Sequence, residues 1–346
     1  MAALSVLLCS ACAEIEKPGD EGWTELGGDR PVLFNSSLAT LATKSYLEEH
    51  TSFGVFAFYQ PGTESSPGTW NSSRTPDFMF NQAVTYNGND SYTYAPIRYW
   101  PSNSYNTLTF WAYYPYDHPN DNIQFVESGS TNTQYTSSST GYPDIKYTVN
   151  AGKTDLLVAA PVTNQSKPAN DAPVSFTFHH TLSEINFQVK KTSDNPIYTV
   201  TLDAIGFKWI YKNGIHSSVS NVHATTPWSN LGGAENAILY AYNPVTGMEV
   251  TGTTEIDVPN STVMLIPQNL ETTGAILYVE YSVSLSGGNP QTYQENIILD
   301  RDPSTSNNDL WEEGKSYTYI LSITPGQPIM FTVSCDTWGD VYHWHL

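Results

Sequence analysis

The chain has 346 residues, of which 34 are acidic and 14 basic, so its formal net charge is −20. A surface this acidic, with no local cluster of lysine and arginine, repels DNA and RNA and excludes nucleic-acid binding. Aromatic residues make up 13% of the chain and charged residues only 14%, which favours β-strands, and no window shows the period of about 3.6 residues expected of a long helix.

The chain begins with a short apolar segment that ends in small residues and a cysteine. Residues 2–13 are too few to span a bilayer, which takes about 20 apolar residues, and they are typical of a secretory signal. The run Ser10-Ala11-Cys12 resembles the lipobox of bacterial lipoproteins, in which the cysteine is acylated. We therefore expect a signal peptide over residues 1–11 and a lipid on Cys12. The alternative is an N-terminal segment with no targeting role.

Residues 12–30 combine charges with several glycines and one proline, a composition that predicts a flexible tether. From residue 31 onward, strand patterns recur about every 10–20 residues between clusters of Gly, Pro, Asn and Ser, which predicts an all-β fold. Residues 51–59 and 106–114 are aromatic on both faces and predict strands that are buried on both sides.

The later strands alternate apolar and polar residues, which predicts one buried face and one face in water. They are predicted over residues 174–178, 184–190, 275–285, 316–323 and 329–335. Residues 192–196 have turn chemistry and separate two strand-rich halves. We expect two β-sandwich domains, over residues 31–194 and 195–346.

No catalytic motif occurs in the sequence. Nucleophile elbow, phosphate loop, dinucleotide fingerprint and zinc-protease helix are all missing, so we expect neither an enzyme nor a cofactor. His343 and His345 would share one face of a strand, but no third metal ligand stands at a suitable spacing. Residues 300–306 start like a calcium loop and lack its glycine and final glutamate. We predict that no metal is bound.

Six tryptophans lie near predicted strand ends or loops. Exposed aromatic side chains at such places stack on sugar rings or anchor a protein interface, although most of them are expected simply to pack at the edge of the core. They are Trp70, Trp100, Trp228, Trp311, Trp338 and Trp344.

Five segments in order carry a resemblance to a known family. They are residues 97–101 (IRYWP) with 110–115 (FWAYYP), 155–159 (DLLVA), 176–189 (FTFHHTLSEINFQV), 264–268 (MLIPQ) and 311–320 (WEEGKSYTYI). From residue 31 to its end, the chain resembles the fimbrillin-like family of type V pili, which are lipoprotein-derived fimbrial subunits of Gram-negative anaerobes. The resemblance implies two tandem transthyretin-like β-sandwiches, export to the surface of the outer membrane through a lipid anchor, and assembly with other fimbrial subunits.

In that family a surface protease removes the first strand after a basic residue, and the terminal strand of a neighbour fills the groove. The resemblance implies that residues 31–36 are this first strand, that Val32 and Phe34 fill its groove, and that Lys44 is the cleavage site. It implies equally that a replacement strand offers Ile329, Phe331 and Val333. An incoming strand satisfies the backbone groups and the apolar trough that the lost strand leaves.

The sequence thus predicts a fimbrial subunit or adhesin that mediates cell adhesion by contact with a host protein or glycan. The alternative is a monomeric surface lipoprotein that binds glycans for nutrient uptake. An enzyme comes third, because no group of catalytic residues can be named.

Overall fold

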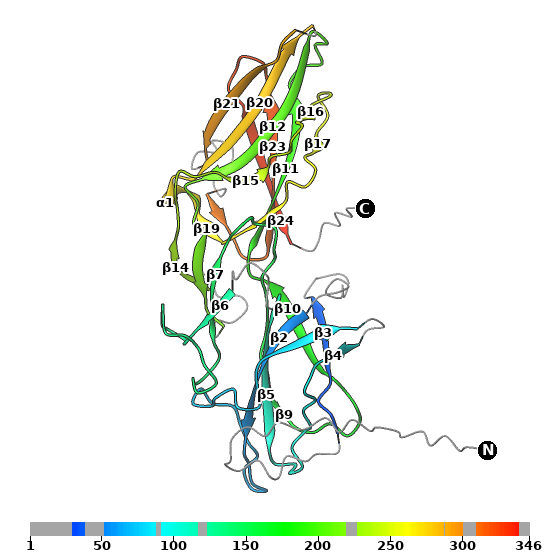
Figure 1. Ribbon diagram of the computed structural model, residues 1–346, viewed down its shortest axis with the longest axis vertical. Coiled ribbons are helices and arrows are strands. Elements are labelled where there is room, and N and C mark those ends of the chain that lie inside the picture. The colour runs from blue at the N-terminus through cyan, green and yellow to red at the C-terminus, as the bar shows by residue number, and fades with distance from the viewer. Residues whose placement is uncertain are drawn as a thin grey trace, which may run out of the picture.

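The computed structural model describes residues 30–38, 52–87, 91–116, 123–218, 227–286, 288–299 and 309–338. These residues form 24 strands and one short helix, α1 (Leu270–Thr273), so the predicted all-β fold is confirmed. No helix among them is long and apolar enough to cross a bilayer. The molecule is elongated, with one group of strands at each end and a smaller group beside the middle (Figure 1).

The first half of the chain forms an eight-stranded sheet in the order β1-β10-β8-β5-β2-β3-β4, with β9 paired to β5. Its strands are β1 (Phe34–Leu38), β2 (Ser52–Gln60), β3 (Met79–Tyr86), β4 (Tyr92–Thr93), β5 (Thr107–Tyr114), β8 (Leu157–Ala159), β9 (Val162–Gln165) and β10 (Val174–His180).

The central strands β2 and β5 are buried on both faces, as the sequence predicted. On β2, Phe53 and Val55 enter a core that belongs to the first half alone. Phe56 and Phe58 point the other way, into a larger core that continues into the second half. A strand with apolar residues at every position needs cover on both sides, and the fold provides it.

The eight-stranded sheet curls around the smaller core until its two edges meet. Ser36 on β1 places its Oγ 2.5 Å from the hydroxyl of Tyr92 on β4. The amide of Val32 donates to the carbonyl of Arg98, in the segment after β4, over 2.9 Å. Strand β1 therefore closes the sheet on itself.

The second half is a β-sandwich of two sheets. One has the order β17-β11-β23-β24 with β18 paired to β11, and the other has the order β15-β12-β20-β21 with β16 paired to β12. The strands are β11 (Ser183–Lys191), β12 (Tyr198–Lys208), β15 (Leu239–Tyr242), β16 (Met248–Glu249), β17 (Ile256–Asp257), β18 (Val263–Leu265), β20 (Ile276–Leu285), β21 (Gln291–Ile298), β23 (Lys315–Ile323) and β24 (Met330–Thr337).

Side chains of the two facing sheets meet in the larger core, where Phe187 of β11, Phe207 of β12 and Tyr319 of β23 lie in ring contact. The alternation predicted for β11 and β23 is confirmed. On β20 the alternation holds up to Val283, whereas Leu285 at the strand end is 56% exposed rather than buried.

The two halves share a sheet with the order β14-β13-β7-β6. Its strands are β6 (Ile123–Val126) and β7 (Asp144–Thr148) from the first half, and β13 (Asn213–His216) and β14 (Trp228–Gly232) from the second. Beside it, β19 (Gln268–Asn269) pairs with β22 (Leu310–Trp311). The chain leaves the eight-stranded sheet after His180 and enters the sandwich of the second half at Ser183. The division into domains 31–194 and 195–346 stays a prediction.

A lysine also joins the halves. The ammonium group of Lys153, in the first half, donates to the carbonyls of Ala241 at 3.1 Å, Asn260 at 2.9 Å and Thr262 at 2.6 Å. One charged donor thus satisfies three acceptors of the second half, one on β15 and two in the segment before β18, and hydrogen bonds to charged groups are the stronger ones.

Replacing Lys153 with Met should lower the free energy of unfolding by about 1–2 kcal/mol, because it leaves three carbonyls without their donor. Lys190→Met is the matched control, since Lys190 makes only a surface ion pair with Glu255 at 2.9 Å, worth at most about 0.5 kcal/mol. Urea denaturation measures both. Equal losses in the two variants would contradict the role of Lys153 as a clamp.

Candidate functional site

The first strand is inserted side chain by side chain into the smaller core. Val32, Phe34 and Ser36 are 0%, 4% and 2% exposed, whereas Leu33 between them is 36% exposed. This is the alternation that a strand needs when one face is buried and the other meets water. The strand predicted over residues 31–36 overlaps β1, which the structure places at Phe34–Leu38. Val32, just before β1, and Phe34 lie in the core of the curled sheet.

Aromatic rings surround Phe34. Its ring centroid lies 5.3 Å from that of Tyr94, 5.8 Å from Phe110 and 5.8 Å from Phe176. Burying one phenylalanine side chain stabilises a fold by about 1.5–3 kcal/mol, and aromatic pairs at these distances add to it. The single ring of Phe34 thus contributes strongly to holding the strand in the core.

Hydrogen bonds hold β1 and the residues just before it on both sides. β1 runs parallel to β10, from Phe34 opposite Val174 to Leu38 opposite Phe178. On its other side the hydroxyl of Tyr94 donates to the carbonyl of Val32 over 2.9 Å. Burial raises the pKa of Tyr94 to about 12, so this hydroxyl stays a donor at all physiological pH values.

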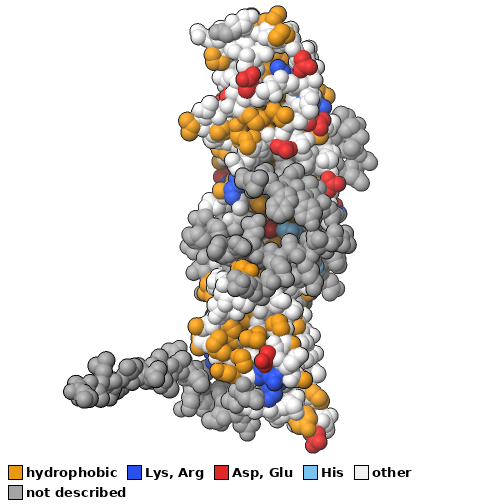
Figure 2. Space-filling model, turned by 90° about the vertical axis from the view of Figure 1, so that its right-hand side faces the viewer, with side chains coloured by type: hydrophobic (Ala, Val, Ile, Leu, Met, Phe, Trp, Pro, Cys, Tyr) orange, Lys and Arg blue, Asp and Glu red, His pale blue; other side chains and the backbone are white. Residues whose placement is uncertain are grey.

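Exposed apolar side chains border this strand. Leu33, Ile97 and Tyr99 are 36%, 43% and 38% exposed, and Pro31 forms an isolated bridge with Tyr99. Figure 2 shows hydrophobic side chains gathered on the end of the molecule that holds the eight-stranded sheet. The surroundings of β1 are therefore apolar outside as well as inside.

The last described strand, β24, lies at the edge of its sheet and pairs only with β23 among the described residues. Ile329, directly before it, is 5% exposed, and its amide donates to Oε2 of Glu295 over 2.9 Å. Phe331 and Val333 are half-buried against the larger core, with the Phe331 ring 6.0 Å from Tyr319. The three side chains share the inner face, as the alternation predicted.

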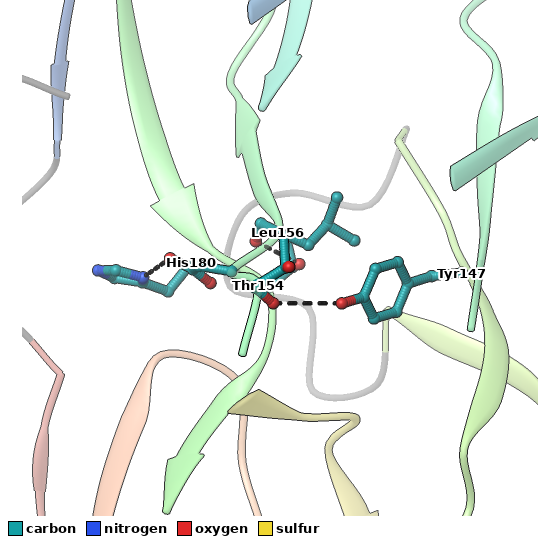
Figure 3. A network of polar contacts seen from close by, with 6 residues as sticks. Tyr147, Thr154, Leu156 and His180 are labelled. Atoms are coloured by element: carbon teal, nitrogen blue, oxygen red, sulfur yellow. Dashed lines mark hydrogen bonds and ion pairs between the residues drawn. The ribbon is translucent and has the colours of Figure 1, made fainter. Parts of the chain in front are cut away.

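Where the two halves meet, a polar network joins β7, the segment before β8 and the end of β10 (Figure 3). His180, the last residue of β10, shares a hydrogen bond of 2.7 Å with Asp155 through Nδ1 and Oδ2. The His180 ring stacks on Trp338, with centroids 3.8 Å apart. The hydroxyl of Tyr147 donates to the carbonyl of Thr154 over 3.2 Å. Segments used for the family resemblance thus meet in space here.

Several predicted sites lie outside the described residues. These are the lipidation site Cys12, the processing site Lys44, the calcium-like stretch 300–306, His343, His345 and Trp344. Among the residues described, no group of three His, Cys, Asp or Glu side chains is placed to hold a metal. The prediction of no metal and no cofactor stays a prediction.

The tryptophans divide into two groups. Trp100, Trp228 and Trp311 are 2%, 7% and 1% exposed, so for these an exposed stacking role is wrong and the simpler expectation of packing in the core is confirmed. Trp70 and Trp338 are half-buried. A tryptophan near a strand end is buried when a second sheet covers that end. The local sequence pattern does not predict this cover.

Sequence reasoning missed the partners that hold the two strands. Tyr94, Glu295 and His180 stand far along the chain from the residues that they contact. The stacking of His180 on Trp338 depends on the meeting of two sheets. Only pairing between strands distant in the sequence brings these groups together.

The comparisons with known proteins agree with this architecture. The fimbrillin-like family model matches residues 40–338, and the chain belongs to this family. A fimbrial protein from Bacteroides vulgatus is similar in structure, with 17% identity, a TM-score of 0.56, and coverage of 90% of this chain and 100% of that one. A proposed cell adhesion protein from Bacteroides ovatus shows 17% identity, a TM-score of 0.50, and coverage of 89% and 96%. No curated protein matches the chain significantly.

Family membership makes the chain a fimbrial protein of the cell surface, as the sequence predicted. The two solved structures share its fold, and at 17% identity the likeness shows the fold alone. Anchoring and assembly are separate questions. Assembly depends on the two strands described above, and anchoring depends on Cys12, which lies outside the described residues.

Replacing Phe34 with Ala should lower the free energy of unfolding by about 3–5 kcal/mol, because a fully packed ring leaves a cavity behind. Leu33→Ala is the control on the same strand, and its change should stay within about 0.5 kcal/mol since this side chain faces outward. Chemical denaturation of both variants provides the measurement. Similar effects of the two changes would contradict the alternation of β1.

Proposed function

We propose that the protein is a non-enzymatic fimbrial subunit, exported as a lipoprotein, anchored in the outer membrane through Cys12, and assembled by exchange of β-strands. Adhesion of the cell is the purpose of the assembly. The observation that carries the proposal is the position of β1 as the strand that closes the curled sheet.

Loss of β1 would open a groove that lacks both a backbone partner and an apolar side chain. The backbone of β10 would lose its parallel partner over five residues. The rings of Tyr94, Phe110 and Phe176 would lose the phenylalanine that they surround. Unpaired backbone beside an apolar trough is the situation in which proteins accept a strand from another chain.

The inner face of β24 has the spacing that this groove requires. Val32, just before β1, stands at alternate positions with Phe34 and Ser36 of β1. Ile329, just before β24, stands at the same spacing with Phe331 and Val333 of β24. In both strands a phenylalanine stands in the middle, after a β-branched residue. A replacement strand in this register would return an aromatic ring to the centre of the ring cluster.

The exchange has to take place between chains. Within one chain β1 belongs to the curled sheet of the first half, and β24 to a sheet of the second half. Donating β24 requires its eight pairings with β23 to be given up, so the groove on the acceptor must compensate for them. An edge strand with a single neighbour is the kind that can leave at the lowest cost.

Limited proteolysis at Lys44 tests assembly. Cleavage should convert the wild-type protein from monomer to oligomers on size-exclusion chromatography with light scattering. Phe331→Asp should abolish the oligomers, because a carboxylate cannot enter the aromatic cluster without a large desolvation cost. Met330→Asp is the matched control, since Met330 is 66% exposed on the opposite face of the strand, and it should assemble like wild type.

Uncleaved Phe331→Asp must first be shown to fold, by circular dichroism and its unfolding midpoint, so that lost assembly is not lost structure. Cleaved wild-type protein that stays monomeric at high concentration would sink the proposal of strand exchange. That result would favour the alternative function, a monomeric surface lipoprotein that binds glycans.

Anchoring is tested separately by Cys12→Ser. This change should abolish fatty-acid labelling and move the protein from the membrane fraction to the soluble fraction, because the acylated thiol is gone. Cys9→Ser, three residues earlier in the same apolar segment, should leave both readouts unchanged. Continued labelling of the Cys12→Ser variant would refute the assignment of the lipid to this residue.

A further inference from the structure

A cavity of about 310 Å³ lies where the two halves meet. Trp70, Tyr142 and Pro161 line it from the first half, and His216 and Pro227 from the second. Glu313, shortly before β23, completes its polar side. The cavity is distinct from the groove of β1 and from the inner face of β24, neither of which contributes a lining residue.

One wall of the cavity is aromatic and rigid. The indole of Trp70 stacks on the ring of Tyr142 with centroids 4.3 Å apart and planes 17° apart. The ring of Phe58 meets the indole edge-on at 4.8 Å. Both neighbours fix the orientation of Trp70, so the wall is formed before any ligand enters.

Three lining residues, one of them Tyr142 of the aromatic wall, carry buried polar atoms that lack hydrogen-bond partners among the described residues. These atoms are both ring nitrogens of His216, which is only 5% exposed, with Oε2 of Glu313 and the hydroxyl of Tyr142. Nε2 of His216 is 3.6 Å from Oε1 of Glu313, which is too long for a hydrogen bond and amounts to an ion pair only when the imidazole is protonated. Buried polar groups without partners are uncommon and destabilising, so they need an explanation.

These atoms form a complementary set of donors and acceptors. A carboxylate accepts hydrogen bonds, a neutral imidazole has one nitrogen of each kind, and burial keeps the Tyr142 hydroxyl protonated by raising its pKa. A ligand that suits the cavity must therefore carry several hydroxyl groups that both donate and accept. It must also present a flat apolar face to the aromatic wall.

We propose that this cavity binds one pyranose ring of a neutral glycan, with its C–H face toward the Trp70 wall and its hydroxyl groups toward His216, Glu313 and Tyr142. A pyranose combines an apolar face with a rim of hydroxyls in one rigid unit. The mixed lining, mostly apolar with a few converging polar groups, is typical of small-molecule sites.

Size and charge restrict the ligand further. Ligand cavities span about 300–1,000 Å³, and this one stands at the small end, so it accommodates a single ring rather than an oligosaccharide. The carboxylate of Glu313 and the net charge of −20 disfavour sugars that carry a carboxylate or sulfate. Neutral terminal sugars remain as the ligand class.

The site goes beyond assembly into fimbriae and does not depend on it. Binding is measured on the purified, uncleaved monomer, so that a negative result leaves strand exchange untouched. The probes are the methyl pyranosides of glucose, galactose, mannose, fucose and N-acetylglucosamine, with the methyl glycoside of glucuronic acid as the charged comparison. Tryptophan fluorescence and isothermal titration calorimetry detect the binding.

At least one neutral pyranoside should bind with a dissociation constant on the order of 1 mM, the range expected for a ligand of this size. The glucuronide should bind at least about tenfold more weakly. Trp70→Ala and His216→Phe should each reduce the affinity about tenfold or more. His216→Phe retains an aromatic ring beside Trp228, whose ring now lies 5.3 Å away, and removes both nitrogens.

Trp209→Ala is the matched control, because Trp209 is 39% exposed and does not line the cavity. Its affinity should equal that of wild type. Circular dichroism and unfolding midpoints establish that each variant is folded. If one of them does not fold, Glu313→Gln, which keeps the shape of the side chain, is tested in its place. No binding of any neutral pyranoside at about 100 mM, far above the expected constant, would overturn the proposal. Binding that survives both His216→Phe and Trp70→Ala would overturn it equally.

Discussion

The curled sheet of the first half can enclose its core only while a strand fills the space between β10 and the segment after β4. β1 fills it now, and its backbone and its alternating side chains are both used there. A buried backbone group that loses its partner and an apolar core that meets water are both costly. The same position therefore stabilises the unassembled chain and defines what an incoming strand must offer.

The arrangement of the two cores limits the damage that loss of β1 would cause. The smaller core, which contains Val32 and Phe34, belongs to the first half alone. The larger core runs from Phe56 and Trp111 through the joint into the sandwich, and contains no residue of β1. The pairing of β7 with β13 and the clamp at Lys153 also lie outside the groove. A chain without its first strand would thus keep its long axis and the relation of its halves.

How much the sequence could predict follows from the range of each interaction. Alternation along β11, β20 and β23 and the two-sided strands β2 and β5 depend on neighbours two residues apart, and the printed sequence was enough to find them. The burial of Trp311 depends on the two sheets of the sandwich, where its ring meets that of Phe207. The stacking of His180 on Trp338 depends on sheets that meet where the two halves join. The sharing of a sheet by both halves was likewise invisible, because β7 ends at Thr148 and β13 begins only at Asn213, with five strands of other sheets between them.

The cavity residues were beyond sequence reasoning for the same cause, and one of them lies close to the end of β24. Glu313 stands next to Gly314, whose carbonyl accepts the amide of Trp338 at 2.9 Å, at the end of β24. Trp338 in turn stacks on His180 at the joint. Donation of β24 would remove the Trp338 contacts, but the loop that carries Glu313 keeps bonds that do not involve β24. The amide of Gly314 donates to the carbonyl of Leu182 at 2.9 Å, and the hydroxyl of Ser183 donates to the carbonyl of Glu312 at 2.8 Å. The Glu313 loop therefore stays attached to the start of β11 whether or not the last strand is in its own sheet, and the cavity does not depend on assembly.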